Sequence, residues 1–237
     1  MTLRLFVDVS LQVTANLALP AGAARHAQVR RVQPGDALVL FDGLGGEWHA
    51  TVLSMGRSEV VVTVHEHLAV DRELPLHVTL AVGAPANDRM DILVEKDTEL
   101  GVARVVPLLC ERSVLRLGGE RAERKREHWQ AVAVAASEQC RRSRVPRVEA
   151  MVAFERGLAD LPPGGERWLL SPASSRPLVR PEAGTRVVVL SGPEGGLSTD
   201  EETVALRAGF EAVSLGPRVL RAETAPLAVL AWLGLGA

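Results

Sequence analysis

The sequence predicts a small antiparallel β domain followed by a larger α/β domain with a mainly parallel sheet. Short β-branched runs broken by turn dipeptides fill the chain to about residue 70, and strands alternate with helices beyond it. A charged segment with a proline, residues 71–75, separates the two patterns and is typical of a domain linker. We therefore expect one domain over residues 1–70 and a second over residues 74–237.

The N-terminal part shows apolar runs interrupted by the turn dipeptides PG (34–35), DG (42–43) and GG (45–46). Runs this short between tight turns indicate an antiparallel barrel or sandwich. The glycines at 43–46 lead into a strand rather than a helix. They therefore form a hairpin and not a dinucleotide-binding fingerprint.

The larger domain is expected to begin with the strand His77–Gly83. Further strands are expected at Ala103–Leu109, Arg167–Ser171, Arg186–Ser191 and Ala212–Leu215. These runs are almost entirely apolar, which is typical of a parallel sheet covered on both faces.

Helices are expected between these strands. The first is capped by Asp88 and stops at Gly101, and the second covers about 123–140. Residues 198–201, Ser-Thr-Asp-Glu, form a capping-box sequence that opens a third helix. The last helix is expected from about Ala225.

Composition narrows the class of protein. With 237 residues, 47% of them hydrophobic and 24% charged, the chain is an ordinary globular protein and not a disordered one. Its formal net charge of -2 gives no general attraction for a polyanion, so any nucleic-acid contact must come from a local patch. Cys110 and Cys140 lack the spacing of a zinc site, and the apolar run 225–237 is too short to span a bilayer. We expect a cytoplasmic protein with no metal and no membrane segment.

One glycine-rich loop, GPEGGLS at 192–198, directly follows an expected buried strand. In open α/β sheets, ligands bind at the carboxyl ends of strands, where loop amides and a helix N-terminus face a crevice. The alternative is a tight turn whose glycines serve geometry alone, and the motif by itself favours neither. It lacks the Lys-Ser/Thr of a phosphate-binding loop.

A second loop, LGPRVLRAETA at 215–225, places two arginines and a carboxylate between a buried strand and the last helix. Such a cluster is typical of the polar wall of a binding pocket. The alternative is a structural ion pair that ties the last helix down.

These two loops resemble the paired cofactor loops of the SPOUT methyltransferases. Further stretches resemble the RsmE-type branch, which methylates N3 of a uridine in 16S ribosomal RNA. EKDTELGV (95–102) is similar to that family's K-A-T-E-L-G-V, with Asp97 where Ala is usual. SEQCRRSRVP (137–146), RLF (4–6) and HAQVRR (26–31) match other family stretches, with Arg30 in place of an expected Leu.

The resemblance implies a small PUA-like β-barrel in front of an α/β domain whose C-terminal segment is threaded into a trefoil knot. It also implies a homodimer that binds S-adenosylmethionine in the knot and acts on 16S ribosomal RNA of the small subunit. Carried over residue by residue, the cofactor would be held by Leu170, Ser171, Pro172, Gly192, Pro193, Glu194, Gly195, Gly196, Leu215, Gly216, Leu220 and Thr224.

The implied reaction needs help with a proton, because N3 of uridine loses its proton readily only above physiological pH. Arg221 and Arg218 are expected to stabilise the anionic uracil, and either Glu223 or Glu194 is expected to accept the proton. Arginines 141 and 142 of a partner subunit are the alternative source of positive charge.

RNA contact is expected from basic residues of both domains. The expected set is Arg4, Arg25, His26, Arg30, Arg31, Arg112, Arg141 and Arg142. Glutamates dilute the charge between residues 111 and 127, so a merely solvated helix is the alternative there. Two other functions compete with the main hypothesis: a SPOUT enzyme with a ribose 2'-O or tRNA target, and a non-catalytic RNA-binding assembly factor.

Overall fold

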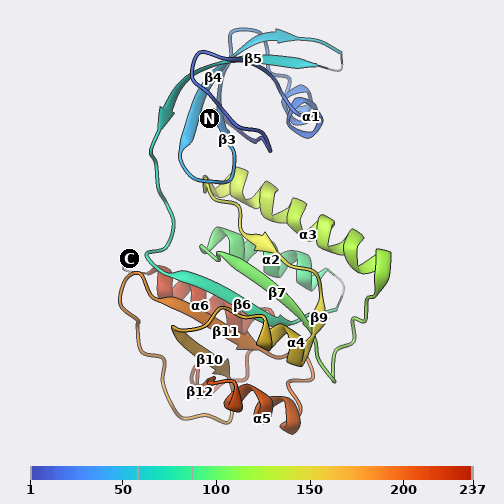
Figure 1. Cartoon of the computed structure of the whole chain (residues 1–237), viewed down its shortest axis with the longest axis vertical. Coiled ribbons are helices and arrows are strands. Elements are labelled where there is room, and N and C mark those ends of the chain that lie inside the picture. Colours follow the sequence, from blue (N-terminus) through green and yellow to red (C-terminus); the bar gives the residue numbers. More distant parts are fainter. Residues whose placement is uncertain (1, 58, 87, 236–237) are drawn as a thin grey trace. The chain divides into compact units, whose positions relative to one another are not determined.

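The computed structural model describes residues 2–57, 59–86 and 88–235. The chain forms two compact units, and Figure 1 shows the elements of each. The first unit comprises the residues up to Glu73 together with Ser137–Val145, and the second comprises Leu74–Ala136 together with the residues from Pro146 onward. The first unit thus includes a short segment from far along the chain. The domain boundary expected at residues 70–74 assigns that segment to the second domain.

The first unit is built on a five-stranded sheet in the order β1-β3-β4-β5-β2. Its strands are β1 (Leu3–Phe6), β2 (Asn16–Ala18), β3 (Ala37–Phe41), β4 (Glu47–Met55) and β5 (Val60–Leu68). Strand β1 pairs in parallel with β3, whereas the other neighbours are antiparallel. The expected all-antiparallel sheet is therefore wrong at this edge, because the connection between β1 and β3 is long enough for a crossover.

The connection between β1 and β3 also contains a helix that sequence analysis missed, α1 (Ala21–Val29). The helix begins after Pro20 and buries Ala23, Ala24 and Ala27, which belong to the core of this unit. Small side chains allow a helix to lie close to a sheet. The alanine spacing was the available signal for this helix.

The second unit contains a seven-stranded, entirely parallel sheet. Its main order is β12-β10-β11-β6-β7-β8, and β9 also pairs with β7. The strands are β6 (His77–Gly83), β7 (Arg104–Leu109), β8 (Arg147–Val148), β9 (Val152–Ala153), β10 (Glu166–Leu170), β11 (Arg186–Ser191) and β12 (Glu211–Val213). After their first residues, β6 and β11 are buried at every position, so both faces of the sheet are covered. The expected parallel sheet is confirmed.

The described residues after β6 contain five helices: α2 (Arg89–Glu99), α3 (Gly119–Cys140), α4 (Phe154–Ala159), α5 (Thr199–Arg207) and α6 (Thr224–Gly234). The end of α3, from Ser137, belongs to the first unit. Helix α2 packs on α6, and α4 packs on α5 (Figure 1). No helix within 2–57, 59–86 and 88–235 is long and apolar enough to cross a membrane.

Of the two helix N-terminal caps expected from the sequence, one is present in the structure. The capping box is confirmed, since Glu201 N donates to Ser198 Oγ at 3.3 Å and Ser198 N donates to Glu201 Oε2 at 2.9 Å. The expected Asp88 cap is wrong, because its side chain makes no capping hydrogen bond and its backbone is already helical. Helix α3 begins at Gly119, four residues before the expected start at 123.

Candidate functional site

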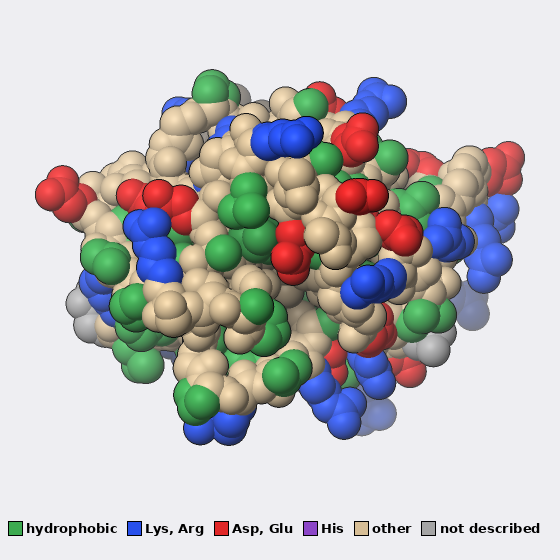
Figure 2. All heavy atoms as spheres, turned by 90° about the horizontal axis from the view of Figure 1, so that it is seen from below, with side chains coloured by type: hydrophobic (Ala, Val, Ile, Leu, Met, Phe, Trp, Pro, Cys, Tyr) green, Lys and Arg blue, Asp and Glu red, His purple; other side chains and the backbone are tan. Residues whose placement is uncertain are grey.

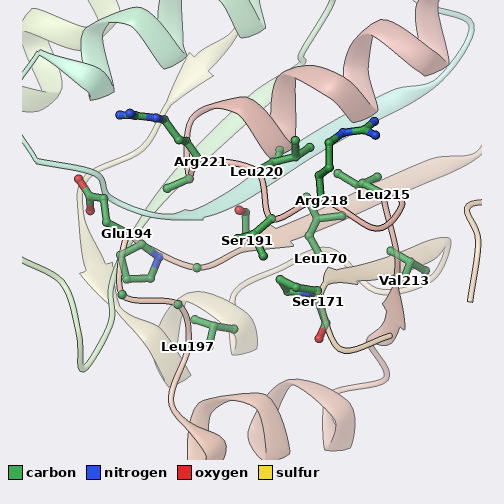
Figure 3. A pocket seen from close by; sticks show the side chains of 18 of the residues that line it. Leu170, Ser171, Ser191, Glu194, Leu197, Val213, Leu215, Arg218, Leu220 and Arg221 are labelled. Atoms are coloured by element: carbon green, nitrogen blue, oxygen red, sulfur yellow. The ribbon is translucent and has the colours of Figure 1, made fainter. Parts of the chain in front are cut away.

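A cavity of about 500 Å³ lies at the carboxyl ends of β10, β11 and β12 (Figure 3). Three segments form its walls: the turn after β10 (170–172), the glycine loop (Gly192–Leu197) and the arginine loop (Leu215–Ala225). Adjacent parallel strands place their carboxyl ends at one edge of a sheet, so segments far apart in sequence meet there. The volume is typical of a small-molecule site.

The cavity brings together nearly all the residues that the sequence predicted for the cofactor and the reaction. Its lining includes Leu170, Ser171, Pro172, Gly192, Pro193, Glu194, Gly195, Gly196, Leu215, Gly216, Arg218, Leu220 and Arg221. Two predicted residues, Glu223 and Thr224, are not part of this lining, although their neighbours Ala222 and Ala225 are.

The glycines of the glycine loop serve its own backbone as well as the cavity. A Cβ on Gly192 would lie 2.8 Å from the Leu197 nitrogen, and Gly196 has a φ of +69° that other residues rarely adopt. A Cβ on Gly83, at the end of β6, would lie 2.4 Å from Pro193. These contacts show that turn geometry requires glycine here, and the binding-loop interpretation remains a prediction.

Glu194 is held in place by two donors. Its Oε1 accepts hydrogen bonds from Ala86 N at 3.0 Å and from Arg89 Nη1 at 3.1 Å. Partial burial acts to raise the pKa of Glu194, but the hydrogen bond from Ala86 and the charge of Arg89 outweigh it and hold the pKa below its ordinary value. A carboxylate with a lowered pKa is a weaker base, so Glu194 is better suited to fixing the loop than to accepting a proton.

The arginine loop presents two guanidinium groups. Figure 3 shows Arg221 extending on the side of Glu194 and Arg218 on the side of Leu215. Both arginines are exposed, and neither side chain has an ion-pair or hydrogen-bond partner in the described part of the chain. The structural ion pair considered for this loop is therefore not present.

The backbone of Arg221 is held by two hydrogen bonds at the start of α6. Its carbonyl oxygen accepts hydrogen bonds from Thr224 N at 2.9 Å and Ala225 N at 3.1 Å, which begins α6.

The Oε2 atom of Glu223 is buried and has no hydrogen-bond partner among the described residues. An oxygen without a donor keeps its lone pairs available.

Two residues expected to contact RNA are buried instead. The guanidinium of Arg4 pairs with Glu47 and donates to the carbonyl oxygen of Arg142 at 3.1 Å, and Arg142 pairs in turn with Glu73. With 7% and 4% of their surfaces exposed, Arg4 and Arg142 hold the first unit together. Their expected role in RNA contact is thus corrected to a structural one.

The other expected RNA contacts lie at or near the surface. Arg25, Arg30, Arg31 and Arg141 are exposed. His26 is partly exposed and lies against Glu138, with Nδ1 3.1 Å from Oε2. The exposed Arg112 donates its Nη1 to backbone carbonyls of the glycine loop.

Sequence analysis missed several lining residues. These are Arg89, Ser191, Glu202 and Val213, whereas Leu197, Val219, Ala222 and Ala225 lie within the two loops that the sequence indicated. Ser191 and Val213 end strands β11 and β12, so the rule that found the loops would have found them. Arg89 comes from the start of α2, and only the strand order brings it to this cavity. No group of three or more His, Cys, Asp or Glu among the described residues could hold a metal ion.

Known protein families and relatives match almost the whole chain. A family model described as RNA methyltransferase domain matches residues 72–234, and one described as RNA methyltransferase PUA domain matches residues 19–64. The ribosomal RNA small subunit methyltransferase E of Synechocystis is 34% identical over 98% of this chain and 77% of its own length. The Bacillus subtilis protein of the same name is 32% identical over 85% of this chain and 82% of its own length.

The chain belongs to the ribosomal RNA small subunit methyltransferase E family. A crystal structure of this family from Neisseria gonorrhoeae, bound to S-adenosyl methionine, is 33% identical with a TM-score of 0.92. That similarity covers 98% of this chain and 97% of the other. The first unit of this family member is accordingly a PUA-like domain, and the second is the α/β methyltransferase domain.

Proposed function

We propose that the protein transfers a methyl group from S-adenosylmethionine to N3 of a uridine in 16S ribosomal RNA of the small subunit. The observation that carries this proposal is the cavity at the ends of β10, β11 and β12, whose three walls are the segments that the family resemblance assigns to the cofactor. The family relationship and the similar Neisseria gonorrhoeae structure, which is bound to S-adenosyl methionine, support it. Such a protein would act in the cytoplasm.

The cavity suits the cofactor in both shape and chemistry. Leu170, Val213, Leu215 and Leu220 give it apolar walls on which an adenine ring can lie. At Gly196 and Gly216 no atom lies within 4 Å of the position that a Cβ would occupy, so a ligand can approach the backbone closely there. When bound, S-adenosylmethionine supplies an electrophilic methyl group on a sulfonium centre.

We assign the arginine loop to the chemical step. Negative charge develops on the uracil as N3 loses its proton, and a preorganised donor stabilises such charge strongly in a water-poor site. Arg221 and Arg218 line the cavity without a carboxylate partner among the described residues, so their charge is available to the substrate. Neither carboxylate expected as proton acceptor is assigned that role: Glu194 is engaged by Arg89 and Ala86, and Glu223 lies outside the lining of the cavity.

We assign RNA contact to local arginines, because the formal net charge of -2 gives no general attraction for a polyanion. Figure 2 shows side chains of both charge signs intermixed over the face seen from below. We assign phosphate contact to the exposed Arg25, Arg30, Arg31 and Arg141. Each such contact adds to the salt dependence of RNA affinity.

The path of the chain around β12 supports the trefoil knot. Within the long segment between β10 and β11, Ser174 Oγ donates to Ala212 O at 2.8 Å, and Ser214 N donates to Arg176 O at 2.7 Å. Farther along that segment, Arg180 donates to the carbonyl oxygens at the end of α6, including Leu233 O at 3.0 Å. The segment therefore lies beside β12 and the end of α6, and this supports our proposal that the chain from β12 to α6 passes through the loop that the segment makes.

A homodimer is also part of this proposal. Helix α6 is apolar on all sides, yet only Pro226, Val229, Leu230 and Leu233 are fully buried. A helix that is apolar all round normally has its whole surface covered. We place a second copy of the chain against the remaining side.

Two measurements test the function. Calorimetry should show S-adenosylmethionine binding to the purified protein, with no comparable heat for ATP at the same concentration. Small subunits from a strain lacking its own enzyme of this family should then accept one methyl group per particle. Binding without methyl transfer would favour the non-catalytic assembly factor, and absence of binding would refute the proposed function.

A further inference from the structure

Arg112 ties the loop after β7 to the glycine loop. Its Nη1 donates to the carbonyl oxygen of Gly195 at 3.1 Å and to that of Leu197 at 3.2 Å. Hydrogen bonds from a charged donor are stronger than those between neutral groups. Gly195 and Leu197 line the cavity, whereas Arg112 does not. The guanidinium therefore acts on the wall of the cavity from behind.

A second tie joins the same two segments. Glu201, which is only 9% exposed, accepts a hydrogen bond from Glu111 N through Oε1 at 2.8 Å. Its other oxygen accepts from Ser198 N in the capping box at 2.9 Å. Glu111, the residue beside Arg112, is thus bound to α5, the helix that follows the glycine loop. This hydrogen bond fixes the backbone of Arg112 relative to the glycine loop.

The glycine loop depends on such outside contacts for its shape. Its three glycines offer no side chains to pack, and glycine loses more conformational freedom on ordering than any other residue. The turn is closed from within by a hydrogen bond from Gly196 N to Pro193 O at 2.8 Å. While Arg112 holds the carbonyls of Gly195 and Leu197, those two peptide groups cannot turn their oxygens into the cavity.

From this geometry we infer that Arg112 is a positioning residue for cofactor binding, which keeps the glycine loop in the conformation that leaves the cavity open. The inference rests on the proposed function, because it takes S-adenosylmethionine as the ligand of the cavity. This role is separate from the expected RNA contact of Arg112, since it uses Nη1, which the carbonyls of the glycine loop occupy. RNA is therefore not needed to observe its effect.

The test measures S-adenosylmethionine affinity by calorimetry in the absence of RNA, for the parent and for R112A, R112K and R116A. Arg116 is the matched control, because it lies in the same loop and donates to Glu111 O at 2.8 Å without contacting the glycine loop. We expect R112A to bind about tenfold more weakly, as for the loss of hydrogen bonds from a charged donor. The affinity of R112K should lie between those of the parent and R112A, and the affinity of R116A should equal that of the parent.

A rescue experiment separates positioning from a merely structural role. Methylguanidinium at tens of millimolar should restore part of the affinity of R112A and leave R116A unchanged, while the melting temperatures of all variants stay close to the parent's. R112A with parental cofactor affinity would overturn the inference, and a loss of RNA affinity alone would return Arg112 to the RNA surface. If R112A does not fold, the test uses R112K instead. In that case, an R112K variant that binds S-adenosylmethionine as tightly as the parent would also overturn the inference. A parent that binds no S-adenosylmethionine would refute the proposed function itself, and the inference with it.

Discussion

The Nη1 atom of Arg89 lies 3.1 Å from Oε1 of Glu194, so the first residue of α2 holds the carboxylate of the glycine loop. Both residues line the cavity. The pair joins the loop after β6 to the loop after β11, which are neighbours because their strands are neighbours. Arg89 and Arg112 thus support the glycine loop from two adjacent strand ends.

Replacing Arg89 with alanine should weaken S-adenosylmethionine binding by at most about fivefold, because an ion pair this exposed contributes roughly 0.2–1 kcal/mol. The effect should depend on pH. Since the pKa of Glu194 is held below its ordinary value of 4.5, the pair persists at and above that pH and is lost as the pH falls through the lowered value. Calorimetry from pH 4 to pH 8 should show that the S-adenosylmethionine affinities of parent and variant approach each other only at acid pH. A difference in affinity between parent and variant that grows as the pH falls would contradict this account.

Arg221→Ala should lower the single-turnover rate of methylation by roughly a hundred- to a thousandfold, the usual cost of removing one preorganised donor. Its side chain has no partner among the described residues, so melting temperature and cofactor affinity should stay near the parent's. Raising the pH should partly restore the rate, because more of the uridine is then already anionic. Unfolding of the variant would indicate a structural role, and a normal rate would move the assignment to Arg218.

Much of the second unit could be predicted because local signals agree with the fold there. The run Arg186–Ser191 forms β11 as expected, since a strand buried on both faces must be apolar throughout. The capping box at Ser198 and Glu201 could be recognised because both partners lie within four residues. Both loops of the cavity followed from strands identified in this way.

The remaining contacts depend on strand order, which no local pattern encodes. Arg89 and Arg112 reach the glycine loop because β6 and β7 follow β11 in the sheet. Arg4 was expected at the surface, but its partners Glu47 and the segment at Arg142 are distant in sequence. A basic residue on a short strand gives no sign that a carboxylate far along the chain will bury it.

The carboxyl group of Asp97 should destabilise the fold. The residue is fully buried in α2, and neither oxygen has a hydrogen-bond partner among the described residues. Burial raises the pKa of Asp97 well above its ordinary 3.8, so folding takes up a proton, and this penalty grows as the pH rises from 3.8 toward the raised value. Asp97→Ala should therefore stabilise the protein at neutral pH by about 1–3 kcal/mol, the typical cost of an unpaired buried polar group.

Urea unfolding at pH 5 and pH 8 measures this gain, which should be larger at pH 8. Asp91 is the matched control on the same helix, because its Oδ1 accepts from Trp129 Nε1 at 3.1 Å. Asp91→Ala should destabilise the protein. A destabilised Asp97→Ala at both pH values would show that the carboxyl group has a favourable partner.

Helix α6 should mediate dimerisation, and sedimentation at micromolar concentration should show a dimer. Leu227 lies on the partly covered side of α6, so Leu227→Arg should shift the protein to monomers by placing a charge in the interface. Leu206 on α5 is 51% exposed, and Leu206→Arg is the matched control that should remain dimeric. A parent that sediments as a monomer would refute the proposed dimer.

The central claim is that the cavity directs a methyl group to N3 of a uridine in small-subunit RNA. Small subunits from a strain lacking its own enzyme of this family would be incubated with the protein and S-adenosylmethionine carrying a deuterated methyl group. The 16S RNA would then be digested and its nucleosides identified by mass spectrometry. The account predicts one labelled N3-methyluridine per RNA with the parent and almost none with Arg221→Ala. Label on a ribose 2'-oxygen, or no label with a parent that binds the cofactor, would contradict it.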